Sequence, residues 1–471
     1  MNRTKKLGKD IILFAIASFG PKIISFILVP FYTSYIKTDD YGTFDLLNTI
    51  VSLALPILVL DISDSVLVFT VKDKSKDKGK YLKYGNYILL LSAIFTFFIG
   101  IVIVCLFNQK SIVWQFAYIW IQFVLLAFYN NLLAYLRGTD NVNWIVFVSL
   151  FNSCITIFLN ILLILGFNMG LFGLMIANTV GWFCSDILIC FKIKISTLKC
   201  KETVTQKVKL EMLAYSCPLI LAGLSWWVIS SEDRLFVSFM LGTTVNGIYA
   251  VAAKIPTILN VCHSVIYQAM QLSVFSEIDS KDSNEYLQRL YNVYSSFMLV
   301  IASVIIACDR FLSTILYKKD YFVAWKYVPG LVIAIALFSI AGYVTTIAAA
   351  KCDSRTITKA TITGAIINTI LNAFLIYKIA LMGAVIATMI SYFVVWLIIT
   401  YDTNKAMNLS LNISRIVISV ILLCVQWWLL VIFESGIVIQ IIFLIGIVVL
   451  HGRIICELLR KMIENVLQKL K

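Results

Sequence analysis

Charged side chains interrupt several of the long apolar runs in this sequence, and their types could bind ions. They are Lys22, Arg234, Lys254, Asp61, Asp64 and Asp233. Ammonium and guanidinium groups donate hydrogen bonds to phosphate oxygens and other anions. Carboxylates balance such positive charge, or they take up a proton or a cation. The residue types therefore indicate an anion site made by the basic residues and a charge-balancing or ion-coupling site made by the acidic ones.

Helical spacing places Lys22 on a polar face of the first apolar run. At about 100° per residue, Ser18, Ser25 and Tyr32 fall with Lys22 inside an arc of roughly 80°. Lys22 also follows Pro21, and a helix often bends at proline and exposes backbone polar groups. We expect this face to line a water-filled space.

Lys254 begins a second polar stripe. If its run is one continuous helix, Thr257, Ser264, Gln268 and Gln271 lie with it inside an arc of about 100°. A surface that faces lipid would not tolerate such a stripe. These polar side chains are therefore also expected to line an aqueous cleft.

Arg234 shares one helical face with Ser216, Gly223, Trp227 and Ser230. A charged side chain near the centre of a bilayer costs about 2.5–3.5 kcal/mol on insertion scales, so it needs a partner, a wet cavity or a function. The polar face around Arg234 favours the cavity.

The acidic residues of the second run have helical spacing, because Asp61, Asp64 and Ser65 stand at i, i+3 and i+4. Four polar-faced helices together indicate a wet central cleft. An alternative remains open, in which the charges are structural ion pairs between helices. Lys22 would then pair with Asp61 or Asp64, and Arg234 with the acidic residues just before it.

The remaining ionisable residues give no catalytic or metal-binding pattern. The chain has only two histidines, His263 and His451, and its eleven cysteines form no Cys-x-x-Cys pair. Asp186 lies near one end of its apolar run and is interpreted as a solvated helix end. We therefore expect no catalytic residues, no metal site and no cofactor, and we do not expect an enzyme.

The elements that position these residues are membrane helices. Hydrophobic residues make up 61% of the 471 residues, charged residues only 14%, and mean hydropathy is +0.92. A soluble protein could not bury so much apolar surface. The net charge of +14 lies mostly between the apolar runs, so it indicates membrane topology and not nucleic-acid binding.

Runs of about 18 to 30 apolar residues predict about fourteen transmembrane helices. They cover residues 11–36, 44–71, 85–107, 113–136, 144–166, 171–191, 211–240, 245–275, 287–307, 328–350, 358–378, 381–400, 413–432 and 435–452. Placing both termini in the cytoplasm puts roughly three quarters of the Lys and Arg residues on the inner side, as the positive-inside rule requires.

The two halves of the sequence look related, since residues 171–183 align without gaps on 381–393. The even offset of about six helices gives both halves the same orientation. We expect an all-α integral membrane protein with two parallel six-helix lobes around a central cleft and two extra C-terminal helices. The expected parts are an N-terminal lobe at 1–191, a cytoplasmic linker at 192–210, a C-terminal lobe at 211–400, the last two helices at 401–452 and an amphipathic basic tail at 453–471.

Several short motifs make the chain resemble polysaccharide and O-antigen flippases, the oligosaccharidyl-lipid branch of the multidrug and polysaccharide exporter superfamily. They are Phe19-Gly-Pro-Lys22, Pro30-Phe-Tyr, Asp39-Asp-Tyr-Gly-Thr-Phe44, Asp233-Arg234, residues 247–255, and the glycines Gly173 and Gly383. The resemblance covers essentially the whole chain.

The resemblance implies a substrate and a mechanism. An undecaprenyl diphosphate-linked oligosaccharide would cross from the inner to the outer leaflet of the bacterial cytoplasmic (inner) membrane by alternating access, for O-antigen, capsule or exopolysaccharide synthesis. Its partners would be that glycan, membrane lipids and other polysaccharide-assembly proteins. The implied roles are substrate binding for Lys22, Lys254 and Arg234, H⁺ or Na⁺ coupling or charge balance for Asp61, Asp64 and Asp233, and cleft lining for Ser18, Ser25, Thr257, Ser264 and Gln268.

Two other functions stay open. An ion-coupled multidrug exporter of the same fold would expose carboxylates and few fixed cations, which the basic residues disfavour. A membrane glycan polymerase or glycosyltransferase generally needs a sizeable loop outside the membrane or a dense set of acid–base residues. No loop of this sequence has such a length.

Overall fold

The computed structural model describes residues 20–452, apart from 24, 74–77, 108–109, 200–203, 281, 352 and 435. All regular elements in this part of the chain are helices, and no strand occurs among the described residues. An apolar chain in lipid must satisfy its backbone hydrogen bonds internally, which a helix does. The expected all-helical class is confirmed. Ser18 and the basic tail at 453–471 lie outside the described residues.

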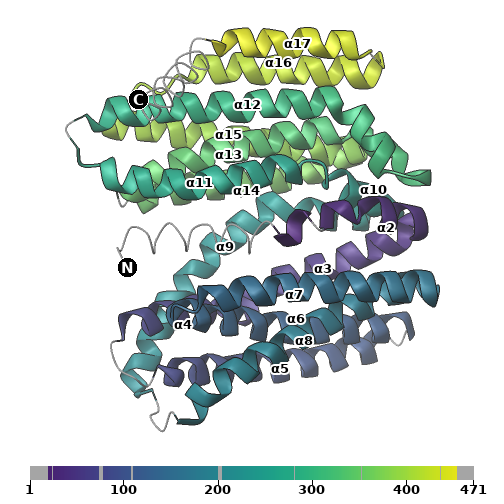
Figure 1. The fold of residues 1–471 in the computed structure, drawn as a ribbon, viewed down its shortest axis with the longest axis vertical. Coiled ribbons are helices and arrows are strands. Elements are labelled where there is room, and N and C mark those ends of the chain that lie inside the picture. The colour runs from purple at the N-terminus through teal and green to yellow at the C-terminus, as the bar shows by residue number, and fades with distance from the viewer. Residues whose placement is uncertain are drawn as a thin grey trace, which may run out of the picture. The chain divides into compact units, whose positions relative to one another are not determined.

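The chain forms two compact units, Met1–Trp227 and Val228–Lys471. The helices of the first unit are α2 (Val29–Tyr35), α3 (Thr38–Leu58), α4 (Ile62–Lys72), α5 (Gly79–Phe107), α6 (Lys110–Gly138), α7 (Val142–Ile161) with the π-helical turn η1 (Leu162–Gly166), and α8 (Gly170–Lys199) (Figure 1). The unit boundary falls inside α9 (Gln206–Leu241). The lobe limits and the linker expected from the sequence stay predictions.

The second unit continues from α9 to the last described helix. Its elements are α10 (Thr243–Ala252), α11 (Thr257–Glu277), α12 (Ser283–Leu316), the 3₁₀ helix η2 (Lys319–Lys326), α13 (Val328–Ala350), α14 (Ser354–Ile379), α15 (Leu381–Met407), α16 (Ile413–Ile432) and α17 (Ile437–Leu450). Helix α13 is buried over most of its length and packs against α11, α12 and α15. It is therefore the centre of this unit.

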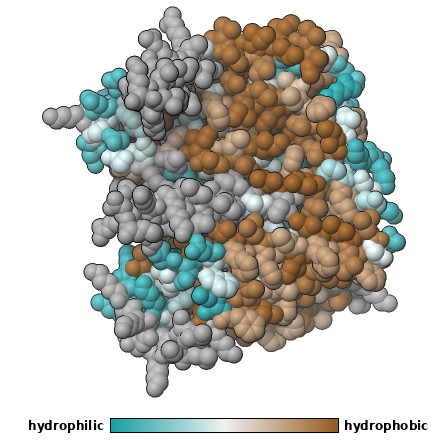
Figure 2. Space-filling model, viewed as in Figure 1, coloured by the Kyte–Doolittle hydropathy of each residue, from teal (hydrophilic) through white to brown (hydrophobic). Residues whose placement is uncertain are grey.

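Twelve of the described helices are long and apolar enough to cross a membrane. Helix α17 is apolar but has only 14 residues, and residues 11–19 of the first expected span lie before the described part of the chain. The polytopic class is confirmed, whereas the count of about fourteen stays a prediction. On the face shown in Figure 2, hydrophobic side chains cover the middle of the helices and hydrophilic side chains gather near their ends.

Two expected spans are interrupted, which corrects the sequence interpretation. The 44–71 run divides into α3 and α4, and Leu60 and Asp61 between them have left-handed φ values of 54° and 49°. The 245–275 run divides into α10 and α11. Proline accounts for the second break, because Pro256 has no N–H to continue the helix. The first break follows Pro56, which lies inside the last turn of α3.

The related segments of the two halves form equivalent hairpins. Helix α8 packs against α7, and α15 packs against α14. A Cβ atom on Gly383 would lie 2.3 Å from the backbone carbon of Leu375, so only glycine fits at the start of α15. At Gly173 in α8 the closest atom would be Ile164 Cγ1, at 3.2 Å. The second hairpin is therefore the tighter one.

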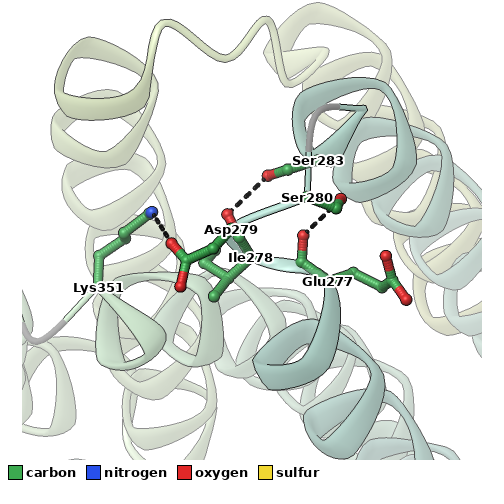
Figure 3. A network of polar contacts seen from close by, with 6 residues as sticks. All are labelled: Glu277, Ile278, Asp279, Ser280, Ser283 and Lys351. Carbon is green, nitrogen blue, oxygen red and sulfur yellow. Dashed lines mark hydrogen bonds and ion pairs between the residues drawn. The ribbon is translucent and has the colours of Figure 1, made fainter.

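Ion pairs join neighbouring helices or their connections at each end of the second unit. The Lys351 ammonium lies 2.8 Å from the Asp279 carboxylate, and Lys359 lies 2.8 Å from Asp402. Figure 3 shows that Asp279 belongs to the α11–α12 connection, where Ser280 and Ser283 hydroxyls donate to backbone carbonyls. These connections after α11, α13 and α15 lie at one end, as alternating membrane crossings require.

At the opposite end, Arg310 pairs with Glu434 at 2.9 Å, and the Trp427 indole donates to the carbonyl of Lys326 at 3.1 Å. Arg310 also lies over the Trp325 ring, with 4.9 Å between the guanidinium carbon and the ring centroid. The connections after α12 and α16 therefore meet at this end. Which end is cytoplasmic stays a prediction from the charge distribution.

Candidate functional site

Lys22 is half-buried and follows Pro21 in a short helical segment. Ser25, three residues further on, is exposed. Among the described residues, no ion pair joins Lys22 to Asp61 or Asp64. The structural ion pair considered for Lys22 is therefore not formed in this structure.

Asp61 and Asp64 line one pocket of the first unit, of about 370 Å³. Residues of α3, α4 and α6 form it, and Ser52, Asn130 and Arg137 add polar groups to its wall. Asp61 occupies the left-handed position before α4, so the break between α3 and α4 sets its direction. The helical i, i+3 relation expected for the two aspartates fails because Asp61 is not helical, yet the pocket still brings them together.

Asp233 is buried in the second unit and accepts hydrogen bonds from three groups. The Tyr249 hydroxyl donates to Oδ2, the Thr388 hydroxyl donates to the same oxygen at 3.2 Å, and the Arg234 N–H donates to Oδ1 at 2.9 Å. Helices α9, α10 and α15 meet at this carboxylate. A buried carboxylate needs such donors, since desolvation of an unpaired charge is costly.

Polar groups of α14 lie close to the same segment of α9. The Thr369 hydroxyl donates to Glu232 Oε2 at 2.8 Å, and Asn372 Nδ2 donates to Asn368 Oδ1 at 3.0 Å. Asn368 Nδ2 and Asn372 Oδ1 are buried and have no partner among the described residues. The sequence interpretation missed these residues, although two asparagines spaced i, i+4 in an apolar run were a signal.

Lys254 lies in the turn between α10 and α11, and its side chain is half-buried. A turn separates Lys254 from α11, so the run is not one continuous helix. That Lys254 shares a face with the polar side chains of α11 stays a prediction. Thr257 in α11 donates to the Lys254 carbonyl at 2.5 Å. The hydroxyl of Ser264 donates to the Asn260 carbonyl at 2.7 Å. The half-buried Gln268 follows on the same helix.

The interpretation of Asp186 as a solvated helix end is wrong. Its side chain in α8 is buried, with 8% of the residue exposed, and neither carboxylate oxygen has a partner among the described residues. Its position near a helix end in the sequence gave no sign of this burial, which arises where α8 packs against α5 and α6.

The predicted site residues thus fall into two groups. Lys22, Ser25, Asp61 and Asp64 belong to the first unit, and Asp233, Arg234, Lys254, Thr257, Ser264 and Gln268 belong to the second. Within the first unit the two aspartates share a pocket. That both groups line one central cleft stays a prediction. No cluster of three or more metal-ligating side chains occurs in the described parts of the chain.

Known proteins resemble this chain in sequence and in fold. The profile of the polysaccharide biosynthesis protein family matches residues 7–279. A protein of the Lsg locus of Haemophilus influenzae is 20% identical over 277 residues, which are 56% of this chain and 65% of that relative. The match therefore spans less than two thirds of the relative's length.

Two solved structures share the fold. An inward closed conformation of the lipid II flippase MurJ has a TM-score of 0.71 at 17% identity, with 96% of this chain and 100% of that chain covered. An inward-facing multidrug resistance transporter of the MATE family, in the MOP superfamily, has a TM-score of 0.64 at 12% identity and covers 83% of this chain and 99% of its own. The resemblance to polysaccharide flippases seen in the sequence motifs is confirmed. This chain belongs to the polysaccharide biosynthesis protein family and has the fold of the MOP-superfamily flippases and transporters.

Proposed function

We propose that the protein is a flippase for lipid-linked glycans. It moves an undecaprenyl diphosphate-linked oligosaccharide from the inner to the outer leaflet of the bacterial cytoplasmic membrane by alternating access. The product serves O-antigen, capsule or exopolysaccharide assembly, and other membrane proteins of that assembly are its partners. Family membership over residues 7–279 supports the glycan substrate, and the fold shared with a lipid II flippase supports the lipid-linked form.

The observation that carries this proposal is the placement of the basic residues. Lys22 follows a proline, and Lys254 lies where a membrane helix is interrupted. Interrupted helices leave backbone groups unpaired and recur at transporter binding sites. Both lysines are half-buried residues, so their ammonium groups would be partly desolvated and would bind a diphosphate more strongly than those of exposed lysines. Arg234 adds a third cation in a membrane helix.

The acidic residues take the roles of charge balance or coupling to H⁺ or Na⁺. Asp61 and Asp64 suit this role in the first unit because their carboxylates reach a pocket. In the second unit Asp233 lies among hydroxyl groups of Tyr249 and Thr388, which offer oxygen ligands or proton partners. Transport measured under imposed H⁺ and Na⁺ gradients distinguishes coupling from charge balance. Replacing an Asp with Asn should abolish the dependence of transport on the gradient only where that carboxylate is the coupling group.

Substitution of the lysines tests the substrate site. Lys22→Ala or Lys254→Ala should reduce glycan export about tenfold or more, the effect of losing one charge-assisted hydrogen bond to phosphate. Arg at either site should retain more export than Gln, because only Arg keeps the charge. Lys351→Ala is the matched control, since its exposed ion pair with Asp279 contributes little. Membrane insertion of each variant is checked by fluorescence-detected chromatography.

Mass spectrometry of the gene-deletion strain identifies the cargo as the lipid-linked oligosaccharide that accumulates on the inner leaflet. Normal export by both alanine variants would refute the cationic site. If drug sensitivity of a pump-deficient host falls on expression while no glycan accumulates on deletion, the protein is a drug exporter. Lengthening of purified lipid-linked repeat units by the protein would identify a polymerase instead.

A further inference from the structure

A pocket of about 770 Å³ lies between α5, α6 and α8 of the first unit. These three helices pack against one another (Figure 1). The pocket wall is largely apolar and aromatic, with Leu125, Phe128 and Leu132 from α6 and Phe183 and Phe191 from α8. Its volume falls within the range of pockets that hold small ligands. None of the residues proposed for substrate binding or coupling lines it.

The Asp186 carboxylate is the unusual group in this apolar wall. The residue is 8% exposed, and both of its carboxylate oxygens are buried without a hydrogen-bond partner in the described part of the chain. A buried carboxylate without donors is strongly disfavoured. A ligand that brings a hydrogen-bonding cation into the pocket would remove this cost.

Lys83 supplies the opposite charge at the same pocket. Lys83 is exposed, lines the pocket and lies one turn after the start of α5 at Gly79. Asn86 adds a second polar group to the wall, and its Oδ1 already accepts from Asn131 at 2.8 Å. One pocket therefore combines an acid, a base and an apolar wall, which matches an amphiphile with both charges in its head group.

We propose that this pocket binds a zwitterionic phospholipid with a primary ammonium, namely phosphatidylethanolamine. The ammonium donates to Asp186, the phosphate lies against Lys83, and an acyl chain packs on Phe128, Phe183 and Phe191. Phosphatidylcholine lacks N–H donors, and phosphatidylglycerol brings only negative charge toward the carboxylate. Because α5 begins and α8 ends at the side expected to be cytoplasmic, the lipid comes from the inner leaflet. The site is separate from the proposed glycan site.

Native mass spectrometry of the delipidated full-length protein tests this site. The protein is incubated in detergent with equimolar phosphatidylethanolamine, phosphatidylcholine and phosphatidylglycerol. The wild type should retain phosphatidylethanolamine at least tenfold over phosphatidylcholine, the discrimination given by a charge-assisted hydrogen bond. Asp186→Asn should reduce this ratio to within about twofold. Asp140→Asn is the matched control, since Asp140 is exposed, left-handed at φ 62° and outside the pocket, and asparagine tolerates that conformation.

Two further measurements keep the test independent of protein folding and of transport. Stepwise N-methylation of phosphatidylethanolamine should lower its retention by the wild type at each step, because each methyl removes a donor. Lys83→Gln should lower retention of phosphatidylethanolamine and of phosphatidylcholine together and preserve their ratio. Equal retention of all lipids by the wild type, or an unchanged ratio in Asp186→Asn, would overturn the proposal. Both readouts are made on purified protein, so they stand even if glycan flipping is disproved.

Discussion

At the scale of single residues, the charged side chains of this protein differ in how completely their surroundings satisfy them. Three donors converge on Asp233, whereas the buried Asp186 has no partner among the described residues. Both are aspartates inside apolar runs, although only Asp233 has charged neighbours in sequence, Glu232 and Arg234. The difference arises from Tyr249 and Thr388, which lie 16 and 155 residues from Asp233 in the chain.

The two glycines that begin α8 and α15 give a paired prediction. Gly383→Ala should destabilise the protein by about 1–3 kcal/mol, because the new Cβ would overlap the backbone of Leu375. Gly173→Ala should change stability by less than about 1 kcal/mol, since its Cβ would come no closer than 3.2 Å to the side chains of Ile164, Leu163 and Met169, and alanine favours the helix. Thermal unfolding of both variants in detergent measures the difference, and equal melting temperatures would contradict the packing argument.

Asp353, at the start of α14, gives a prediction for pH dependence. Its Oδ1 accepts from the Thr356 N–H at 3.1 Å, and this hydrogen bond lowers the pKa of the carboxyl. A lowered folded-state pKa means that the stabilisation is complete above the unfolded-state pKa of about 4 and is lost as pH falls through the folded value. Asp353→Ala should cost about 0.5–2 kcal/mol at neutral pH.

Asp353→Asn is the control for this cap, because asparagine keeps the acceptor and does not titrate. As pH falls from 5 to 3, the melting temperature of the wild type should therefore fall relative to that of Asp353→Asn. A difference that is constant over this range would show that the carboxylate charge does not stabilise the helix.

At the scale of elements, a buried histidine connects three helices at the end of α17. His451 Nδ1 lies 2.7 Å from the Ser296 hydroxyl of α12, and Nε2 lies 2.9 Å from the Ser419 hydroxyl of α16. The side chain is fully buried. These two contacts indicate a structural role for His451.

His451→Ala should destabilise the second unit by about 2–4 kcal/mol, because it removes two hydrogen bonds and leaves a cavity. Ser419→Ala removes one of these bonds and little volume, so its effect should be less than half as large. Unfolding in detergent followed by tryptophan fluorescence gives both values. A wild-type melting temperature for His451→Ala would show that the three helices do not depend on this contact.

The elements also show which features of the fold could be predicted from sequence patterns. The apolar runs predicted the positions of the long helices because a membrane segment must be continuous in hydrophobicity. They could not predict the breaks before Asp61 and at Lys254, because hydrophobicity continues through both turns. Pro56 and Pro256 were the available signals, since proline removes a backbone donor.

At the scale of the whole molecule, the alternation of helix ends gives a topology test. Asp320 in η2 and Arg355 in α14 lie near opposite ends of the second unit. In a background without cysteines, an impermeant maleimide should label Asp320→Cys in intact cells and Arg355→Cys only after permeabilisation. This result is expected because the positive-inside rule places the connection before α14 in the cytoplasm. The reverse labelling would place both termini outside.

Helix α9 begins in one compact unit and ends in the other, so one helix contributes residues to both. In its first part, the Met212 carbonyl accepts from Ser65, and the Trp227 indole donates to Ser52 at 2.9 Å. If the chain were divided between α8 and α9, Met212 and Trp227 would lie on the C-terminal fragment, and their partners Ser65 and Ser52 would lie on the N-terminal fragment. The C-terminal fragment would carry a docking helix for the N-terminal fragment. The two gene halves are therefore suited to separate expression and reassembly, and α9 would act as the recognition element between them.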